Sequence, residues 1–274
     1  MRSVAGKTVL VTGAAAGLGR LFAERAVAEG ATALVLWDVD EQALTTTAAE
    51  LEQGRVPVRA DVVDVSSPEQ VRRAAESVLA EVGAVQVLIN NAGIVRGNTY
   101  FWEHDGVDDV EAVMGVNAVG PMLVARAFLP SMIDSRSECR LMTLASSAGL
   151  VSNPRMAVYA ASKWAAVGWS DSVRLELAQA GHSRVRMTTV CPTYIDTGMF
   201  AGTRTMLLTP ILEPGDVVDG AWSAMLRGDA FYITPWSSRL NHAIGRLLPV
   251  RLRDFYLDRA GVYHSMDDFT GHDA

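Results

Sequence analysis

The chain has 274 residues, of which 49% are hydrophobic and 20% are charged. This is enough apolar sequence for a large buried core in one α/β domain. The formal net charge of -7 argues against broad nucleic-acid binding, because that function needs a basic face. The two cysteines, Cys139 and Cys191, lie in apolar runs, and we expect buried, reduced thiols. No CxxC pattern or Cys/His cluster occurs in the sequence, so no metal site is predicted.

Residues 1–7 are short and polar, and they lead directly into a strand-like run. The sequence contains neither the apolar stretch of a signal peptide nor a run of apolar residues long enough to span a bilayer. We therefore expect a cytoplasmic protein without a transmembrane segment.

Strand-like and helix-like patterns alternate along the chain. In chain order, the predicted elements are a strand at 8–12, a helix at 18–29, a strand at 33–37, a helix at 41–53, a strand at 56–60, a helix at 68–82, a strand at 85–89, a helix at 108–132, a strand at 140–145, a helix at 157–180, a strand at 184–191, a helix at 214–226 and a strand at 231–234. Alternating elements with continuously apolar strands indicate a parallel sheet covered by helices on both faces.

The right-handed crossover rule makes a Rossmann-type doubly wound sheet of about seven strands the simplest topology. Because no proline- or glycine-rich linker divides the chain, we expect a single α/β domain. Residues 1–236 are predicted to form the nucleotide-binding catalytic domain, with a substrate loop at about 193–213. Residues 237–274 are predicted to be a C-terminal extension packed on the same domain.

A glycine-rich turn separates the first predicted strand from the first helix. Gly13, Gly17 and Gly19 lie in this turn. Glycines let bare backbone approach a pyrophosphate, and the amides and dipole of a helix N-terminus favour an anion. In this context, after a strand and at the start of a helix, the pattern favours a dinucleotide site over an ordinary turn.

Asp38 ends the second predicted strand, about 20 residues beyond the glycines. A carboxylate there can accept hydrogen bonds from the adenosine ribose and would repel a 2′-phosphate, so NAD(H) is favoured over NADP(H). The alternative is that Asp38 caps the helix that starts near Asp40. Arg20 is the nearest base that could attract a phosphate.

The spacing Thr12-Gly13-x-x-x-Gly17-x-Gly19 resembles the fingerprint of the short-chain dehydrogenase/reductase (SDR) family. Over residues 5–235 further motifs agree in order: Asp61-Val62, Asn90-Asn91-Ala92-Gly93, Asn117, Ser146, Tyr159-Ala160-Ala161-Ser162-Lys163, Pro192-Thr193 and Thr197-Gly198-Met199. One departure is Thr193, which stands where the family commonly has glycine.

The resemblance implies a catalytic set of Asn117, Ser146, Tyr159 and Lys163. It implies cofactor contacts from Gly13, Gly17, Leu18, Gly19, Asp38, Asp61, Val62, Asn90, Ala92, Gly93, Tyr159, Lys163, Pro192, Ile195 and Thr197. It also implies that Lys163 grips the nicotinamide ribose, that Asn117 holds a water between Lys163 and solvent, and that the protein is a homotetramer or homodimer.

Tyr159 and Lys163 are four residues apart, which puts both side chains on one face of a helix. A tyrosine with an ordinary pKa near 10 is a poor base at neutral pH, and a neighbouring ammonium lowers that pKa. Tyr159 is therefore predicted to exchange a proton with an alcohol or carbonyl as hydride moves to or from a nicotinamide. Ser146 is predicted to hold the substrate oxygen.

The substrate loop and the residues after the fourth predicted strand are expected to determine substrate specificity. In the substrate loop and after the fourth strand, either a pocket lining or plain packing is indicated for Met199, Phe200, Met206, Leu207, Leu208, Tyr100, Phe101 and Trp102. The extension carries helical apolar spacing from Leu240 to Leu248, with Arg239 and Arg246 interspersed. Packing or an oligomer contact is favoured for it, with a lid and a membrane-surface helix as alternatives. Its segment 265–271 resembles the retinol- and hydroxysteroid-dehydrogenase-like branch of the family.

The sequence therefore predicts an NAD(H)-dependent oxidoreductase that interconverts a hydroxyl and a carbonyl on a lipophilic small molecule. A steroid, a retinoid or a long-chain alcohol fits this description. The alternatives are an NADPH-dependent reductase of a 3-oxoacyl thioester type, and a nucleotide-binding regulator that has lost turnover. The presence of Ser146, Tyr159 and Lys163 together argues against the regulator.

Overall fold

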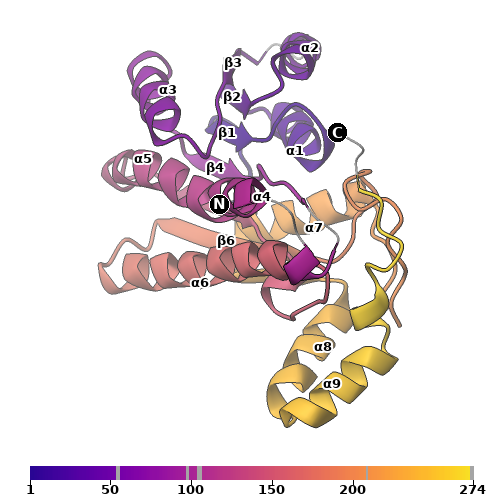
Figure 1. Ribbon diagram of the computed structural model, residues 1–274. Helices are drawn as coiled ribbons and strands as arrows, with labels where there is room; N and C mark the ends of the chain where they lie inside the picture. The colour runs from indigo at the N-terminus through magenta and orange to yellow at the C-terminus, as the bar shows by residue number, and fades with distance from the viewer. Residues whose placement is uncertain (54–55, 97–98, 104–106, 208, 272–274) are drawn as a thin grey trace.

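A computed structural model describes residues 1–53, 56–96, 99–103, 107–207 and 209–271 (Figure 1). Within these residues, seven strands form one parallel sheet in the order β3-β2-β1-β4-β5-β6-β7. Their bounds are Thr8–Thr12 for β1, Ala33–Asp38 for β2, Val58–Val62 for β3, Val87–Asn90 for β4, Cys139–Leu144 for β5, Val185–Pro192 for β6 and Phe231–Thr234 for β7. The strand order reverses between β1 and β4, which opens a crevice at the carboxyl edge of the sheet.

Helices cover both faces of the sheet, as predicted (Figure 1). One face carries α1 (Gly17–Ala28), α2 (Glu41–Glu52) and α7 (Pro214–Arg227), and the other carries α3 (Pro68–Glu81), α5 (Gly120–Asp134) and α6 (Ala157–Gln179). Phe22 stacks on Trp222 in the first core layer, and Trp37 contacts Phe128 in the second. The central strands are buried along their whole length, which explains their unbroken apolar runs. The predicted doubly wound fold is confirmed.

The helix predicted over 108–132 is three pieces: α4 (Val107–Met114), a π-helical turn η2 (Gly115–Val119) and α5. The stretch Val107–Asp134 is long and apolar enough to cross a membrane by length and composition. It packs against α3 and α6 in the cover of the sheet, so we interpret it as a core helix. The π turn matters because such turns are frequent at functional sites, and this one contains Asn117.

The third strand begins at Val58, two residues later than predicted. Val58 pairs with Leu34, and the Leu34 amide donates to the carbonyl of Pro57. This register carries β3 to Val62, so the loop at its carboxyl end begins at Val63.

The C-terminal extension forms two helices, α8 (Trp236–Leu247) and α9 (Val250–Arg259), which project from the body as a hairpin (Figure 1). After α9 the chain returns to the substrate loop through a short helix, η4 (Val262–His264). The Leu207 amide donates to the Ala260 carbonyl, and the Arg204 amide donates to the Ser265 carbonyl. The loop and the extension are therefore held together by backbone hydrogen bonds.

Candidate active site

The turn between β1 and α1 is shaped by Gly13 and Gly17, whose φ values of +63° and +54° lie in the left-handed region that favours glycine. The side-chain amide of Asn91 donates to the carbonyls of Thr12 and Gly13, at 3.0 Å each. The space in front of Gly17 is open, since a Cβ there would meet only Thr197, at 4.0 Å. An open, rigid turn results at a helix N-terminus, the place where an anion is bound most readily.

A solvent-open cavity of about 1330 Å³ runs from this turn along the carboxyl edge of the sheet to the start of α6. It is lined by these predicted site residues: Gly13, Gly17, Leu18, Asp38, Ala92, Gly93, Ser146, Tyr159, Lys163, Pro192, Ile195 and Thr197. The cavity thus brings together residues from the ends of β1, β2, β4, β5 and β6 and from the starts of α1 and α6. Gly19, Asp61, Val62 and Asn90 are not among the lining residues.

The prediction for Asp61 and Val62 needs correction. Both Asp61 carboxylate oxygens accept hydrogen bonds from the Arg59 guanidinium, and one also accepts from the Trp37 indole. Val62 is exposed away from the cavity. Asp64 and Val65 line the cavity instead, because β3 ends at Val62 and the following turn meets the crevice.

Two further predicted cofactor residues have structural roles. The Asn90 side-chain amide donates to the carbonyl of Pro121, while the neighbouring Asn91 lines the cavity. Gly19 packs the first turn of α1 onto the glycine-rich turn, since a Cβ there would lie 1.8 Å from the Gly13 carbonyl oxygen. Both residues support the cavity without lining it.

Asp38 lies at the carboxyl end of β2, and in the sheet β1 and β4 stand between β2 and β5, the strand that ends before Ser146. One of its carboxylate oxygens accepts from the Ala15 amide at 2.8 Å, and the other accepts from the Val39 and Asp40 amides. The cap of α2 is Asp40, whose side chain accepts from the Ala43 amide. The alternative interpretation of Asp38 as the helix cap is therefore wrong.

Ser146, Tyr159 and Lys163 meet where β5 ends and α6 begins. Ser146 caps the short helix η3 (Ser147–Gly149), and its hydroxyl accepts from the Ala148 amide at 3.1 Å. The Lys163 ammonium donates to the Leu144 carbonyl at 3.0 Å and lies 5.6 Å from the centre of the Tyr159 ring. This arrangement places a hydroxyl, a phenol and an ammonium at one buried point of the cavity wall.

Burial raises the pKa of Tyr159, and a hydrogen bond with Ser146 opposes that rise. The lowering of the Tyr159 pKa expected from Lys163 is not found: desolvation of the phenolate is the largest contribution, and the neighbouring Tyr194 raises the pKa further. The protein without cofactor therefore keeps Tyr159 as a neutral phenol, the form that donates a proton to a carbonyl oxygen.

Burial also lowers the pKa of Lys163 to about 8. Because this lies below the ordinary lysine value of 10.5, the buried ammonium costs the folded state about 3 kcal/mol at neutral pH. That cost disappears as the pH rises from about 8 to 10.5 and the folded chain loses the proton first.

Lys163→Met is expected to raise the free energy of unfolding by roughly this amount at pH 7, measured by urea unfolding. The difference from the unmutated chain should vanish near pH 10.5; a difference that stays constant with pH would point to packing instead.

Asn117 connects the π turn to the loop after β4. Its side-chain oxygen accepts from the Ile94 amide at 2.8 Å, and its side-chain nitrogen donates to the Ile94 carbonyl at 2.8 Å and to the Ser162 hydroxyl at 3.2 Å. A Cβ on Gly93 would lie 3.3 Å from Asn117 and 3.5 Å from the Lys163 ammonium. Asn117 is thus a neighbour of Lys163, and its predicted role in holding a water stays a prediction.

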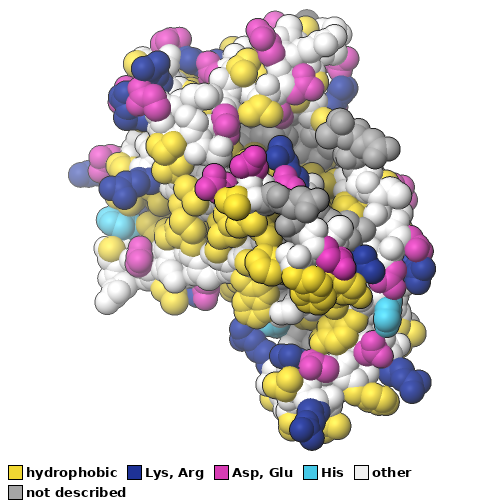
Figure 2. Space-filling view, in the orientation of Figure 1, with side chains coloured by type: hydrophobic (Ala, Val, Ile, Leu, Met, Phe, Trp, Pro, Cys, Tyr) yellow, Lys and Arg dark blue, Asp and Glu magenta, His cyan; other side chains and the backbone are white. Residues whose placement is uncertain are grey.

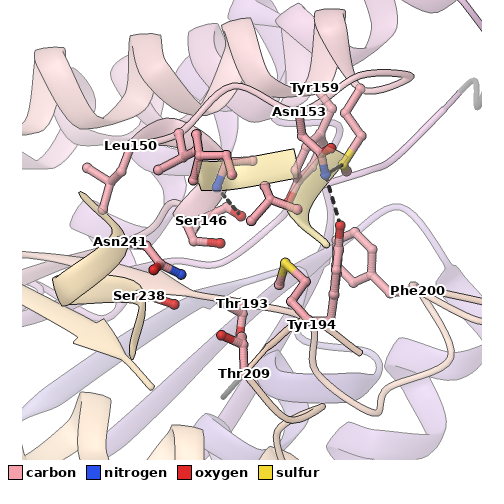
Figure 3. Close-up of a pocket in the computed structure, with 17 residues that line it drawn as sticks. Ser146, Leu150, Asn153, Tyr159, Thr193, Tyr194, Phe200, Thr209, Ser238 and Asn241 are labelled. Carbon is pink, nitrogen blue, oxygen red and sulfur yellow. Dashed lines mark hydrogen bonds between the residues drawn. The ribbon is translucent and has the colours of Figure 1, made fainter. Parts of the chain in front are cut away.

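A second cavity, of about 610 Å³ including its mouth, opens beyond Ser146 and Tyr159 (Figure 3). Its walls are mostly apolar and include Leu150, Val151, Met156, Phe200, Met206, Leu257 and Val262. Ser238 and Asn241 lie on the side away from Phe200 (Figure 3). The extension therefore forms one wall of this pocket through α8, α9 and η4.

The predicted pocket residues divide into three groups. Met199 and Phe200 line the larger cavity, and Phe200 and Met206 line the second one. Leu207, by contrast, is 63% exposed, and the aromatic residues 100–102 are exposed as well. Leu208 lies outside the described residues.

A buried polar network in the wall of the second cavity was not predicted. The Asn153 amide donates to the Tyr194 hydroxyl at 3.1 Å and to the Ser265 hydroxyl at 3.0 Å, and these two hydroxyls are 2.8 Å apart. The partners are 41 to 112 residues apart in sequence, so no local spacing could have indicated them. The network fixes the extension against the wall that carries Tyr159.

Thr193 lines both cavities and so stands between them. Its hydroxyl is buried and has no hydrogen-bond partner within the described part of the chain. A bound ligand can supply the hydrogen-bond partner that such a buried hydroxyl lacks.

A parallel sheet with a glycine-rich turn after β1, a carboxylate at the end of β2 and a Ser–Tyr–Lys cluster at the same edge defines a nucleotide-binding α/β oxidoreductase. The model of the short chain dehydrogenase family matches residues 7–207. The chain therefore belongs to this family, and it is an oxidoreductase.

Relatives and solved structures agree with this assignment. The chain is 38% identical to mouse epidermal retinol dehydrogenase 2, over 98% of this chain and 87% of that protein. It is 36% identical to rat estradiol 17-beta-dehydrogenase 11, over 95% of this chain and 86% of that protein. A short chain dehydrogenase/reductase from Burkholderia phymatum in complex with NAD superposes with a TM-score of 0.81 at 29% identity, over 94% of this chain and 97% of that one. The predicted resemblance to the family and to its retinol-dehydrogenase-like branch is confirmed.

Proposed function

We propose that this protein is an NAD(H)-dependent dehydrogenase or reductase of a lipophilic alcohol and its carbonyl form, of retinoid, steroid or long-chain type. The observation that carries the proposal is the mostly apolar second cavity, which opens directly on Ser146 and Tyr159 and shares both with the larger cavity. The similarity to proteins named for retinol and estradiol supports the same substrate class.

The larger cavity fits a nicotinamide dinucleotide. Open space in front of Gly17 suits a pyrophosphate, and the unpartnered hydroxyl of Thr193 is available to a ligand between the two cavities. Asp38 and Lys163 both line the cavity, and we infer that each would hold one of the two riboses. A cofactor bound there would supply or accept the hydride.

The residues of the chain handle the proton and the substrate oxygen. Tyr159 would donate its phenolic proton to a carbonyl oxygen in reduction and take one back from the alcohol in oxidation. Ser146 would hold that oxygen through its hydroxyl. Phe200 lies edge-on to the Tyr159 ring, with centroids 6.0 Å apart, and shields the phenol from water.

Charge at the Asp38 end favours NAD(H). The described residues that line this end include the carboxylates of Asp38 and Asp64, whereas the cation of the lining, Lys163, is near Tyr159. Arg20 is held in ion pairs with Glu24 and Glu50. Among the residues that the structure describes, a 2′-phosphate would therefore meet negative charge without a free cation beside it.

Calorimetric titration is expected to show NADH binding tighter than NADPH binding by tenfold or more, about 1.4 kcal/mol. Asp38→Ala should weaken NADH binding and narrow that ratio, because it removes both the ribose acceptor and the repulsion of a 2′-phosphate. Asp40→Ala is the matched control: it removes a carboxylate that caps α2, and it should leave the ratio unchanged.

The same protein should oxidise members of a panel of retinoid, steroid and long-chain alcohols. A preference for NADPH with turnover of a 3-oxoacyl thioester would replace the proposal by the biosynthetic reductase. NADH binding without turnover of any panel member would favour the regulator.

A further inference from the structure

The helix α8 is amphipathic in the opposite sense to an ordinary surface helix. Its inner side is polar: Ser237 and Ser238 are buried, and Asn241 accepts a hydrogen bond from the Tyr256 hydroxyl at 2.6 Å. On this side the Ser237 hydroxyl also bonds with the Thr209 hydroxyl at 3.0 Å. A helix normally turns its apolar residues inward, whereas here Leu240 and Leu247 are exposed and Ile244 is half-buried.

The outer face of α8 consists of apolar residues and arginines. At helical spacing, it carries the exposed residues Trp236, Arg239, Leu240, Ala243, Arg246 and Leu247. Trp236 is 64% exposed and Leu247 is 84% exposed, values far from those of packed side chains of this size. The start of α9 continues the surface with Val250 and Leu252, and we call the whole the α8 face.

Positive charge surrounds this apolar surface. Residues 236–259 contain five arginines and two aspartates, in a chain whose formal net charge is -7. Arg246 and Arg251 have no acidic partner within the residues that the structure describes. Figure 2 shows hydrophobic side chains among Lys and Arg side chains on the projecting part of the molecule where Figure 1 places α8 and α9.

We propose that the α8 face docks on an anionic membrane surface, with its apolar side chains in the headgroup region and its arginines on lipid phosphates. Apolar residues beside arginines on one helix face are the pattern of an interfacial helix. With 12 residues, α8 is about 18 Å long, too short to span the hydrocarbon core.

Charge distinguishes this occupant from a second copy of the chain. A two-fold contact through the α8 face would bring two arginine-rich surfaces together, and like charges there would repel. Anionic headgroups complement the same surface and attract each nearby arginine.

The α8 face lies next to the second cavity, so docking on a membrane would bring that cavity close to the bilayer. The inner side of α8 contributes Ser238 and Asn241 to the wall of that cavity, so one thin helix separates the cavity from the α8 face. With the proposed function, on which this use of the docking rests, a lipophilic alcohol dissolved in a bilayer would lie close to the pocket that binds it. The docking itself does not depend on turnover.

Flotation of the full chain with vesicles tests the proposal, using phosphatidylcholine alone and phosphatidylcholine with phosphatidylglycerol. We expect binding to the anionic vesicles that weakens with salt, and weaker binding to the neutral ones. Leu240→Gln/Leu247→Gln should lower the bound fraction by about tenfold or more, since it removes two exposed anchors. Arg246→Glu/Arg251→Glu should remove the preference for anionic vesicles.

Matched control variants distinguish vesicle binding through the α8 face from nonspecific adsorption of the protein. Leu175→Gln makes the same change at a leucine on α6 that is 53% exposed, and Arg126→Glu reverses an exposed arginine on α5; both should bind as the unmutated chain does. Circular dichroism and NADH titration check that the variants are folded. Absence of vesicle binding, or an equal loss in the controls, would overturn the proposal. Loss of self-association in the α8 variants without vesicle binding would assign the face to a second copy instead.

Discussion

Replacing Tyr159 by phenylalanine is expected to lower kcat by about 10³-fold while NADH binding is retained. The change removes one hydroxyl and leaves the ring, which is 5% exposed and in edge contact with Phe200. The proton donor is lost, whereas Ser146 and Lys163 keep their places. Steady-state turnover with the best alcohol of the panel and calorimetric NADH titration measure the two quantities separately.

Tyr194→Phe is the control for this prediction. Tyr194 is also buried in the same aromatic cluster, and its hydroxyl takes part in the network with Asn153 and Ser265. Losing that hydroxyl should cost stability, about 1 kcal/mol, with a change in kcat of less than about tenfold. Equal losses of turnover in both variants would mean that the cluster acts through packing, and undiminished turnover in Tyr159→Phe would refute the acid/base role.

The part of the site that could be predicted from the sequence lies at strand ends. The carboxyl ends of parallel strands meet at one edge of a sheet, so motifs at successive strand ends converge even when they are far apart in sequence. Gly13, Asp38, Ala92, Ser146 and Pro192 illustrate this, and all line one cavity. The prediction failed at Asp61, where a register set by Leu34 and Val58 carried the strand two residues further and brought Asp64 to the edge.

The extension could not be placed from sequence for a different reason. Its apolar spacing correctly predicted a helix, but periodicity shows only that a helix has two unlike faces. Which face is buried depends on the partner, and here the partner side is polar, with Thr209 and Tyr256 bonding to Ser237 and Asn241. Contacts of this kind join residues that no local pattern connects.

Gly19→Ala is expected to destabilise the fold by about 2–3 kcal/mol and to weaken NADH binding by about tenfold or more. The new Cβ would lie 1.8 Å from the Gly13 carbonyl oxygen and 2.6 Å from the Asn91 side-chain nitrogen. The closest of these atoms belongs to the backbone of the glycine-rich turn, so the first turn of α1 and the cofactor cradle must move apart. Urea unfolding and NADH titration report the two losses.

Gly168→Ala provides the contrast, because a Cβ at this helical glycine of α6 would meet nothing within 4 Å. The same chemical change there should stabilise the protein by about 0.5–1 kcal/mol, since alanine loses less backbone entropy than glycine in a helix. NADH binding should stay unchanged. If Gly19→Ala unfolds at the same urea concentration as Gly168→Ala, the glycine-rich turn accommodates a Cβ at position 19 without loss of stability. The packing role assigned to Gly19 would then be wrong. If it is destabilised but binds NADH normally, the first turn of α1 supports the fold without shaping the cofactor cradle.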